Sequence, residues 1–308
     1  MEYVIGIDGG GTKMHLVAAD RQMNILFETF GGSSNLTSLS AKAVQQNLCD
    51  LLDRFFSESG LRRSDCRCVC LGSAGAGRDS ARIQLAAMLR EAGADGEIFI
   101  TNDAESALAG GSETGDGILL IAGTGSICFG KNRRGETWRT GGWGHIAGDE
   151  GSGYDMACKI LRAVVRGADG RGGPTILTEL VKEYWELENM DGLMDAVYRS
   201  GKGKSEIAAL ASLCETACEK GDKAAFQIVE SCAEELAEMA AVTAERLWGS
   251  EESVPCIYAG GLLEKSAHLR QCLQSSLLQK RPNLKLQFCM HDAAWGCASM
   301  AWKQIGGP

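Results

Sequence analysis

The stretch GIDGGGTK, Gly6 to Lys13, decides how this chain folds. Apolar residues precede it and follow it, so it predicts two short strands joined by a glycine-rich turn. A dinucleotide fingerprint would open a helix here, and the Walker A spacing is absent. A hairpin turn this bare lets backbone N–H groups approach an anion such as a phosphate. The residues expected to contact that anion are Gly9, Gly10, Gly11, Thr12 and Lys13.

The same pattern returns in GILLIAGTGSICFG, which begins at Gly117. An apolar strand again leads through a glycine and hydroxyl turn into another strand. The residues of this second turn are Gly123, Thr124, Gly125 and Ser126. Glycines are common in hairpins, so one such turn is weak evidence. Two copies predict two related domains that together clamp phosphates.

Strand and helix patterns alternate along the first third of the chain, which predicts an open α/β sheet with an antiparallel hairpin start. Helices are expected at about 40–59 and 79–92, and a strand at EIFIT, 97–101. Beyond Ser152 the chain becomes strongly helical, with one long amphipathic helix at about 222–248. We expect an N-terminal domain of 1–116 plus 293–308 and a C-terminal domain of 117–292.

Composition excludes several classes of protein. The 308 residues are 44% hydrophobic and 23% charged, which is typical of a globular protein. A net charge of −9 without basic clusters argues against nucleic-acid binding. The apolar runs are too short for a membrane span, and no signal peptide is evident. We expect a soluble, cytoplasmic protein that uses neither nucleic acid nor membrane as a partner.

The 13 cysteines are scattered and contain no C-x-x-C pair. Cys66, Cys68 and Cys70 alternate along a predicted strand, which would place all three on one face. We interpret the cysteines as small buried hydrophobic residues in a reducing compartment, with a zinc or iron–sulfur site as the alternative.

Two aspartates stand where the predicted strands end. Asp8 follows the first strand, where a carboxylate would repel bare phosphate, so it predicts a Mg²⁺ between the two; a turn cap is the alternative. Asp103 emerges at the carboxyl end of EIFIT, where open α/β sheets keep their ligands. Capping of the next helix is its alternative role.

These residues carry a resemblance. GIDGGGTK, AGTGS and YAGG match, in order, the phosphate and adenosine motifs of the sugar-kinase/Hsp70/actin (ribonuclease H-like) ATPase fold. TNDAESALAG and GGWGHIAGDEGSG resemble the N-acetylglucosamine kinase branch of the BadF/BadG/BcrA/BcrD ATPase group. The resemblance covers nearly the whole chain and implies two facing α/β domains, with ATP and Mg²⁺ bound in the cleft between them. It also allows a homodimer.

Position by position, the resemblance implies that Asp103 accepts the proton of the attacking sugar hydroxyl. It places Gly260 and Gly261 of YAGG against the adenosine, although Leu262 stands where the family has a small or β-branched residue. It assigns the sugar to Asn35, Gly142, Trp143, Gly144 and Asp149. A turn asparagine, a core tryptophan and a helix-capping aspartate are the simpler alternatives for Asn35, Trp143 and Asp149.

The implied activity is ATP-dependent phosphorylation of an amino sugar, N-acetylglucosamine at its 6-hydroxyl, with N-acetylmuramic acid as second substrate and glucosamine as third. Arg78 is a candidate for the carboxylate of muramic acid. A related repressor and kinase family is set aside, because its cysteine-rich zinc motif is absent after His145. The remaining alternatives are an iron–sulfur activator of 2-hydroxyacyl-CoA dehydratases, suggested by Cys128 and Cys158, and a sugar-sensing regulator without activity.

Overall fold

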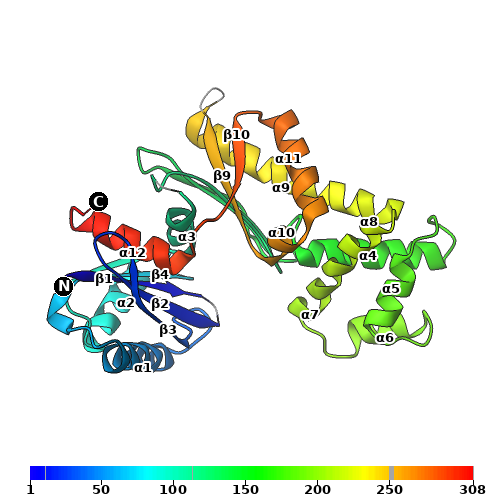
Figure 1. Ribbon diagram of the computed structural model, residues 1–308. Helices are drawn as coiled ribbons and strands as arrows, with labels where there is room; N and C mark the ends of the chain where they lie inside the picture. Colours follow the sequence, from blue (N-terminus) through cyan, green and yellow to red (C-terminus); the bar gives the residue numbers. More distant parts are fainter. Residues whose placement is uncertain (11, 113, 250–252, 308) are drawn as a thin grey trace. The chain divides into compact units, whose positions relative to one another are not determined.

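The computed structural model describes residues 1–10, 12–112, 114–249 and 253–307. The chain divides into two compact units, of which unit 1 contains Met1–Asp116 with Cys289–Pro308 and unit 2 contains Gly117–Phe288 (Figure 1). The division expected from the sequence kept the chain as far as residue 292 in the second domain.

The segment from Cys289 to residue 292 belongs to unit 1 because of its hydrogen bonds. The Cys289 thiol donates to the Ala107 carbonyl, and the His291 N–H donates to the Gly110 carbonyl. Both acceptors lie in one helix of unit 1, so the chain is already attached to that unit before its last helix begins.

Unit 1 is built on a five-stranded sheet in the order β3-β2-β1-β4-β5. The strands are β1 (Tyr3–Gly9), β2 (Lys13–Ala19), β3 (Ile25–Gly32), β4 (Cys66–Ser73) and β5 (Glu97–Thr101). The first three pair antiparallel, whereas β4 and β5 continue in parallel with β1. The predicted antiparallel start is confirmed.

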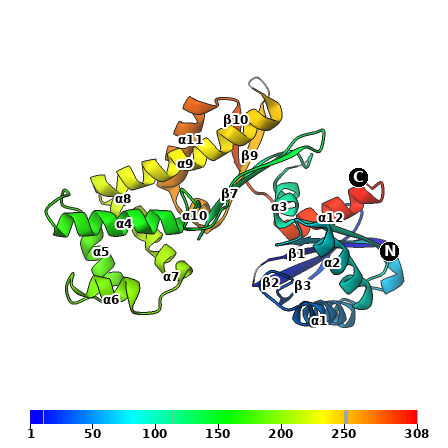
Figure 2. The same ribbon diagram turned by 180° about the vertical axis from the view of Figure 1, so that it is seen from behind.

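Helices cover both faces of this sheet (Figures 1 and 2). One core lies under α1 (Ala41–Ser59) and α2 (Asp79–Glu91), with the short η1 (Arg63–Asp65) between them. A second core lies under α12 (Ala293–Gln304), which also packs on α3 (Asp103–Gly111). The unit therefore has three layers. Because β1, β4 and β5 run parallel, their carboxyl ends lie at one edge of the sheet, where ligands of open α/β sheets bind.

Unit 2 repeats the topology, with the sheet order β10-β9-β6-β7-β8. Its strands are β6 (Gly117–Ala122), β7 (Ser126–Lys131), β8 (Thr137–Gly141), β9 (Val254–Ala259) and β10 (Leu284–Phe288). Again the first three strands pair antiparallel and the last two in parallel. This repeat confirms the fold class expected from the two glycine turns.

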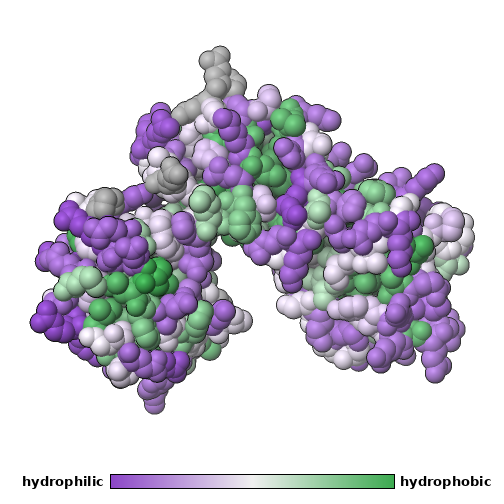
Figure 3. Space-filling view, in the orientation of Figure 1, coloured by the Kyte–Doolittle hydropathy of each residue, from purple (hydrophilic) through white to green (hydrophobic). Residues whose placement is uncertain are grey.

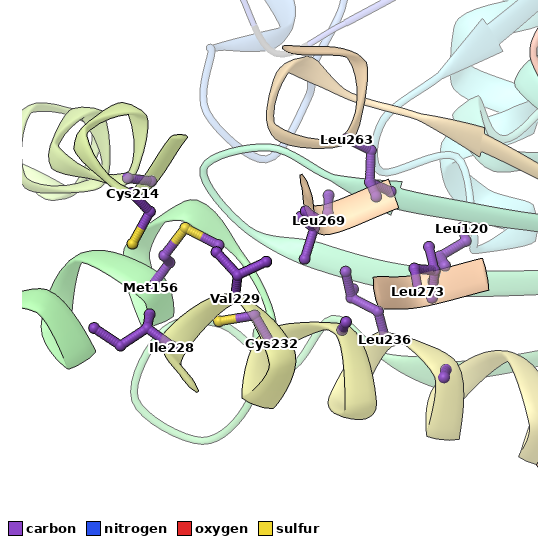
Figure 4. Close-up of a cluster of buried hydrophobic side chains, with 14 of the residues drawn as sticks. Leu120, Met156, Cys214, Ile228, Val229, Cys232, Leu236, Leu263, Leu269 and Leu273 are labelled. Atoms are coloured by element: carbon purple, nitrogen blue, oxygen red, sulfur yellow. The ribbon is translucent and has the colours of Figure 1, made fainter. Parts of the chain in front are cut away.

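A large apolar core joins the sheet of unit 2 to its helices, and Figure 4 shows part of it, with Leu120, Met156 and Leu236 among its side chains. The long helix α9 crosses the sheet, and α11 packs alongside it. The helices are α4 (Gly153–Ala168), α5 (Leu177–Tyr184), α6 (Gly192–Tyr198), α7 (Lys204–Ala208), η2 (Ala209–Ala211), α8 (Ser212–Glu219), α9 (Lys223–Trp248), α10 (Gly261–Lys265) and α11 (Ala267–Lys280).

Residues 261–280 form two helices, although their sequence also fits one helix from about 262 to 279. Ser266 adopts an extended backbone conformation, and its hydroxyl accepts a hydrogen bond from the Leu269 N–H, so it ends α10 and caps α11. Helix α6 and strand β8 were not predicted.

The prediction that three cysteines share one face is wrong. A β-bulge in β4 shifts the register, so that Tyr3 pairs with Cys66 but Val4 pairs with Cys68. The extra residue turns Cys66 toward the core under α1 and α2, while Cys68 and Cys70 face α12.

Hydrophilic side chains predominate on the visible surface, with apolar patches between them (Figure 3). Among the described residues, no helix has both the length and the apolar character needed to cross a membrane.

Candidate active site

The first glycine turn joins β1 to β2 and is enclosed by the chain that follows β3. A Cβ atom on Gly9 would lie 2.1 Å from the Ser34 hydroxyl oxygen and 3.0 Å from the Gly72 carbonyl oxygen. The Ser33 hydroxyl donates a 2.9 Å hydrogen bond to the Gly10 carbonyl. Glycine is therefore required at position 9 by close packing around the turn.

The rest of this turn is open to solvent where the structure describes it. Thr12 and Lys13 are exposed, and the Lys13 ammonium lies 5.0 Å from the centre of the Phe30 ring. Gly11 lies outside the described residues. The predicted hydroxyl and ammonium groups are thus accessible to a ligand.

Asp8 lies in an acidic environment at the end of β1. Burial raises the pKa of its carboxyl group to about 6, and the nearby charges of Asp103 and Asp292 act in the same direction. His15 and Lys13 oppose this rise. A half-buried carboxylate that also feels the negative charges of two other acids is suited to a cation, because the cation would offset their mutual repulsion.

His15 is a feature of this edge that the sequence analysis missed. It stands opposite Asp8 in the β1–β2 pair, and its Nδ1 lies 3.0 Å from an Asp292 carboxylate oxygen. Its Nε2 lies 3.1 Å from Glu28, and its ring stacks on Phe30 at 4.4 Å. The hydrogen bond to Asp292 raises the pKa of His15 and lowers that of Asp292.

Asp103 is the first residue of α3, but it does not cap the helix. Asn102 does so, since its side chain accepts from the Glu105 N–H at 2.8 Å. The exposed Asp103 carboxylate accepts only from the N–H of its neighbour Ala104 within the described chain. Capping is therefore excluded as its role, and the carboxylate remains available to a substrate.

Asn35 follows β3 and forms a turn of its own. Its side-chain oxygen accepts from the N–H and the hydroxyl of Thr37, at 2.9 and 2.7 Å. Asn35 therefore does stabilise a turn, which was the simpler alternative expected from the sequence. The amide nitrogen of Asn35 makes no hydrogen bond to any described residue, so it can act toward a sugar as a donor only.

The second glycine turn, in unit 2, is hydrogen-bonded to the first residues of α4 and to the loop before that helix. The Gly153 N–H donates to the Gly123 carbonyl at 2.7 Å, and the Tyr154 N–H donates to the Thr124 carbonyl. The Ser126 hydroxyl is buried and donates to the Glu150 carbonyl at 2.7 Å. Ser126 therefore holds the turn in place here, whereas Thr124 is exposed.

A cavity of about 500 Å³ opens beside this turn, and Gly123, Thr124, Gly261 and Leu262 all line it. Gly260 has φ of +97°, and a Cβ atom there would lie 2.5 Å from the Ala122 carbonyl oxygen. A Cβ on Gly261 would meet no atom within 4 Å. Gly260 is thus demanded by the fold, whereas Gly261 leaves open space in which a ligand fits against the backbone.

Several other residues that line the cavity belong to no sequence motif. Glu215 of α8 accepts from the Ala267 N–H at the start of α11, and its other oxygen accepts from the Ser266 hydroxyl at 2.5 Å. Lys265 and Tyr184 also line the cavity. The cavity therefore combines apolar, acidic and basic surfaces, as a nucleotide base and ribose require.

The segment Gly142 to Gly144, for which the resemblance implies sugar binding, lies in a loop after β8 and is here called the sugar motif of unit 2. Gly142 and Gly144 have φ of +70° and +85°. Trp143 is 70% exposed, which excludes the core alternative, and the Arg139 guanidinium lies 4.4 Å from its ring centre. One face of the indole is thus covered by a cation, and the other is available for a sugar ring.

Asp149 lies between this loop and the second turn. It is 5% exposed, has φ of +59°, and its Oδ2 lies 2.7 Å from the Lys204 ammonium. A Cβ atom on Gly125 would lie 2.9 Å from the same oxygen. Ser152, not Asp149, caps α4, so the capping alternative is excluded.

Three other residues that the sequence analysis singled out are Arg78, His145 and Cys128. Arg78 is exposed at the start of α2, and His145 is exposed with its ring edge-on to Tyr154. Cys128 is fully buried, which raises the pKa of its thiol to about 12. Within the described ranges, no three histidine, cysteine or acidic side chains are arranged to hold a metal.

The sequence and the fold of this chain have counterparts in known proteins. Residues 5–299 match the model of the BadF/BadG/BcrA/BcrD ATPase family, and the chain belongs to this family. Among curated relatives, an N-acetylmuramic acid/N-acetylglucosamine kinase of Clostridium acetobutylicum is 38% identical over 98% of both chains. An N-acetyl-D-glucosamine kinase of Dictyostelium discoideum is 29% identical over 97% of this chain and 98% of its own length.

Solved structures support the fold. A structure named for a candidate N-acetylglucosamine kinase of Chromobacterium violaceum superposes with a TM-score of 0.73. It is 24% identical, and the match covers 98% of this chain and 99% of that one. The duplicated sheets described above are thus shared with that structure.

Proposed function

We propose that this protein phosphorylates an amino sugar with ATP, converting N-acetylglucosamine to its 6-phosphate and accepting N-acetylmuramic acid as well. The observation that carries the proposal is the cavity of unit 2. Gly123 of the second turn and Gly261 line it, and neither has a side chain that would keep a ligand away from the backbone. The Clostridium relative, which matches over nearly its whole length, carries the name of a kinase for both sugars.

In this proposal Asp103 is the catalytic base. Its carboxylate is exposed, does not cap α3 and lies just beyond the carboxyl end of β5. It can therefore accept the proton of the sugar 6-hydroxyl as that oxygen attacks the γ-phosphorus. The ADP oxygen leaves as the new P–O bond forms. Positioning and charge stabilisation then supply most of the rate enhancement.

The two turns would hold the phosphates through backbone N–H groups, with Thr12, Lys13 and Thr124 beside them. The adenosine would lie along Gly260 and Gly261. Asp8 would hold a Mg²⁺ ion directly or through water, since its carboxyl group is half-buried and feels the charges of other acids. When bound, this ion neutralises negative charge on the phosphates.

Sugar recognition would fall to Asn35 and to the motif of unit 2. Asn35 would donate through its amide nitrogen, and Trp143 would offer one indole face to the pyranose or the acetyl group. Asp149 has one carboxylate oxygen bound to Lys204 and another that can accept from hydroxyl groups.

The test is a coupled ADP-release assay with Mg-ATP and N-acetylglucosamine, N-acetylmuramic acid, glucosamine or glucose, with sugar-free ATPase as the blank. We expect sugar-dependent turnover that is greatest with an N-acetylated sugar, because polar groups that bind the amide would be unpaired with glucose. A preference for glucosamine would favour the glucosamine kinase alternative. ATP hydrolysis independent of sugar, together with bound iron, would instead favour an electron-transfer activator.

A further inference from the structure

The ion pair between Asp149 and Lys204 is an unusual feature of unit 2. The Asp149 side chain is 7% exposed and that of Lys204 is 31% exposed, with 2.7 Å between Oδ2 and Nζ. Asp149 is one of only three described residues other than glycine with a positive φ. Backbone strain of this kind is concentrated at functional sites, and a buried carboxylate needs a charged or hydrogen-bonding partner.

The pair lies where the sugar motif meets the second turn. Its carboxylate fills the space next to Gly125, and the following loop is fastened to the turn by the bond from Ser126 to Glu150. Lys204 is the first residue of α7, and its neighbour Ser205 lines the cavity that Gly123 and Thr124 also line. The ammonium group is therefore in contact with Asp149, which is proposed to bind the sugar, and its neighbour Ser205 lines the cavity proposed for the nucleotide.

We propose that Lys204 is the residue that lets this site accept an amino sugar bearing a carboxylate, by binding that carboxylate beside Asp149. This inference rests on the proposed function, of which it specifies the substrate class. An ionised Asp149 alone would repel the lactyl carboxylate of N-acetylmuramic acid. A lysine ammonium has three N–H donors, and since Asp149 takes one, others remain for the substrate.

Two other cations of unit 2 are less suited to this role. The Lys202 ammonium donates to the Ser200 hydroxyl and lies 5.4 Å from the centre of the Trp185 ring. The Arg139 guanidinium stacks on Trp143 and is not bonded to the buried acid. Lys202 is two residues from Lys204 on the same segment, so it provides a matched control.

The experiment compares the wild-type protein with Lys204→Gln, Lys204→Ala and Lys202→Gln. Initial rates give kcat/KM for N-acetylglucosamine and for N-acetylmuramic acid at saturating Mg-ATP, together with the KM for ATP. Glutamine can still donate to Asp149, so this variant removes the charge with the least disturbance of folding. Thermal unfolding of each variant checks that the fold is kept.

We expect Lys204→Gln to lower kcat/KM for N-acetylmuramic acid about 10-fold or more relative to N-acetylglucosamine, through a raised KM, because a charge-assisted hydrogen bond is lost. Added salt should raise the KM of the wild type for N-acetylmuramic acid and have little effect in this variant. Lys202→Gln should leave the ratio of the two sugars unchanged.

An equal loss with both sugars would overturn the inference, since Lys204 would then only support Asp149. A raised KM for ATP alone would also overturn it and assign the ammonium to the nucleotide phosphates. A wild type that uses N-acetylglucosamine but not N-acetylmuramic acid would refute this inference and the second substrate of the proposed function, and it would leave the phosphorylation of N-acetylglucosamine standing. Turnover of neither sugar would refute both.

Discussion

Replacing Asp8 with asparagine should make unit 1 more stable at neutral pH while impairing its proposed activity. The pKa of the Asp8 carboxyl group is raised from an ordinary 3.8 to about 6, first by burial and then by Asp103 and Asp292. The folded protein therefore binds this proton more tightly than the unfolded chain does. The stability that this group contributes is present below about pH 4 and is lost as the pH rises through about 6.

The size of the effect follows from the two pKa values. The difference between about 6 and 3.8, at about 1.4 kcal/mol per pH unit, corresponds to about 3 kcal/mol above pH 7. Asparagine has nearly the same shape and no charge, so it removes this cost. The pKa of about 6 already includes the opposing attraction of His15 and Lys13, so we expect a net gain of roughly 1 to 3 kcal/mol.

Urea unfolding at several pH values between about 4 and 8, in buffer with a chelator, measures this gain. Hydrogen exchange of β1 peptides assigns the transition to unit 1. The two proteins should be equally stable near pH 4, where the wild-type carboxyl group is protonated, and should diverge as the pH rises. Mg-ADP should then stabilise the wild type more than the variant, because only the wild type keeps the carboxylate for the metal.

Asp20→Asn is a control of opposite sign. Hydrogen bonds from Asn24 lower the pKa of the exposed Asp20 carboxyl group, so its contribution is present at neutral pH and is lost as the pH falls. Two results would refute the electrostatic reasoning about Asp8. One is an Asp8→Asn variant that is less stable than the wild type at pH 7, and the other is a difference in free energy of unfolding between the two proteins that does not change with pH.

Three further changes test the site. Asp103→Asn should lower sugar-dependent kcat by about 10²- to 10⁴-fold with an unchanged unfolding temperature; turnover within about tenfold of the wild type would remove its role as base. Gly261→Val should weaken ADP binding in calorimetry at little cost in stability, because its Cβ enters open space, whereas Gly260→Ala should lower the unfolding temperature because of its φ of +97°. Trp143→Ala should lower kcat/KM for N-acetylglucosamine while stability stays constant, since the ring is 70% exposed; unchanged kinetics would contradict a sugar contact.

The elements that sequence predicted well are those with strong local signals. The two hairpins follow from apolar runs interrupted by glycines, and α1 and α9 follow from regular apolar stripes. The start of α3 is also a local signal, although the cap proved to be Asn102 and not Asp103. Because Asn102 caps the helix, the Asp103 carboxylate does not have to. Which of the two neighbouring residues is the cap depends on backbone geometry, and the sequence pattern does not reveal it.

The elements that were missed depend on tertiary contacts. Strand β8 has largely exposed residues and exists because it pairs with β7 at the edge of the sheet. The bulge that reverses Cys66 arises from pairing with β1 and leaves no mark in the alternating pattern. Lys204 meets Asp149, and His15 meets Asp292, across long stretches of chain, so no local motif signals either pair.

Each unit has one aspartate beside its glycine turn, half-buried Asp8 in unit 1 and buried Asp149 in unit 2, and the surroundings of the two differ. Asp8 has other acids near it, with His15 and Lys13 acting on it only as nearby charges, so its negative charge is poorly compensated and favours a cation. Asp149 has an ammonium at 2.7 Å, so its charge is compensated and the pair can bind hydroxyl groups or a further carboxylate. In a chain of net charge −9, anionic ligands then depend on backbone N–H groups and a few placed lysines. In the proposed function, these two environments within one repeated topology would let Asp8 of unit 1 hold the metal and Asp149 of unit 2 bind sugar hydroxyl groups.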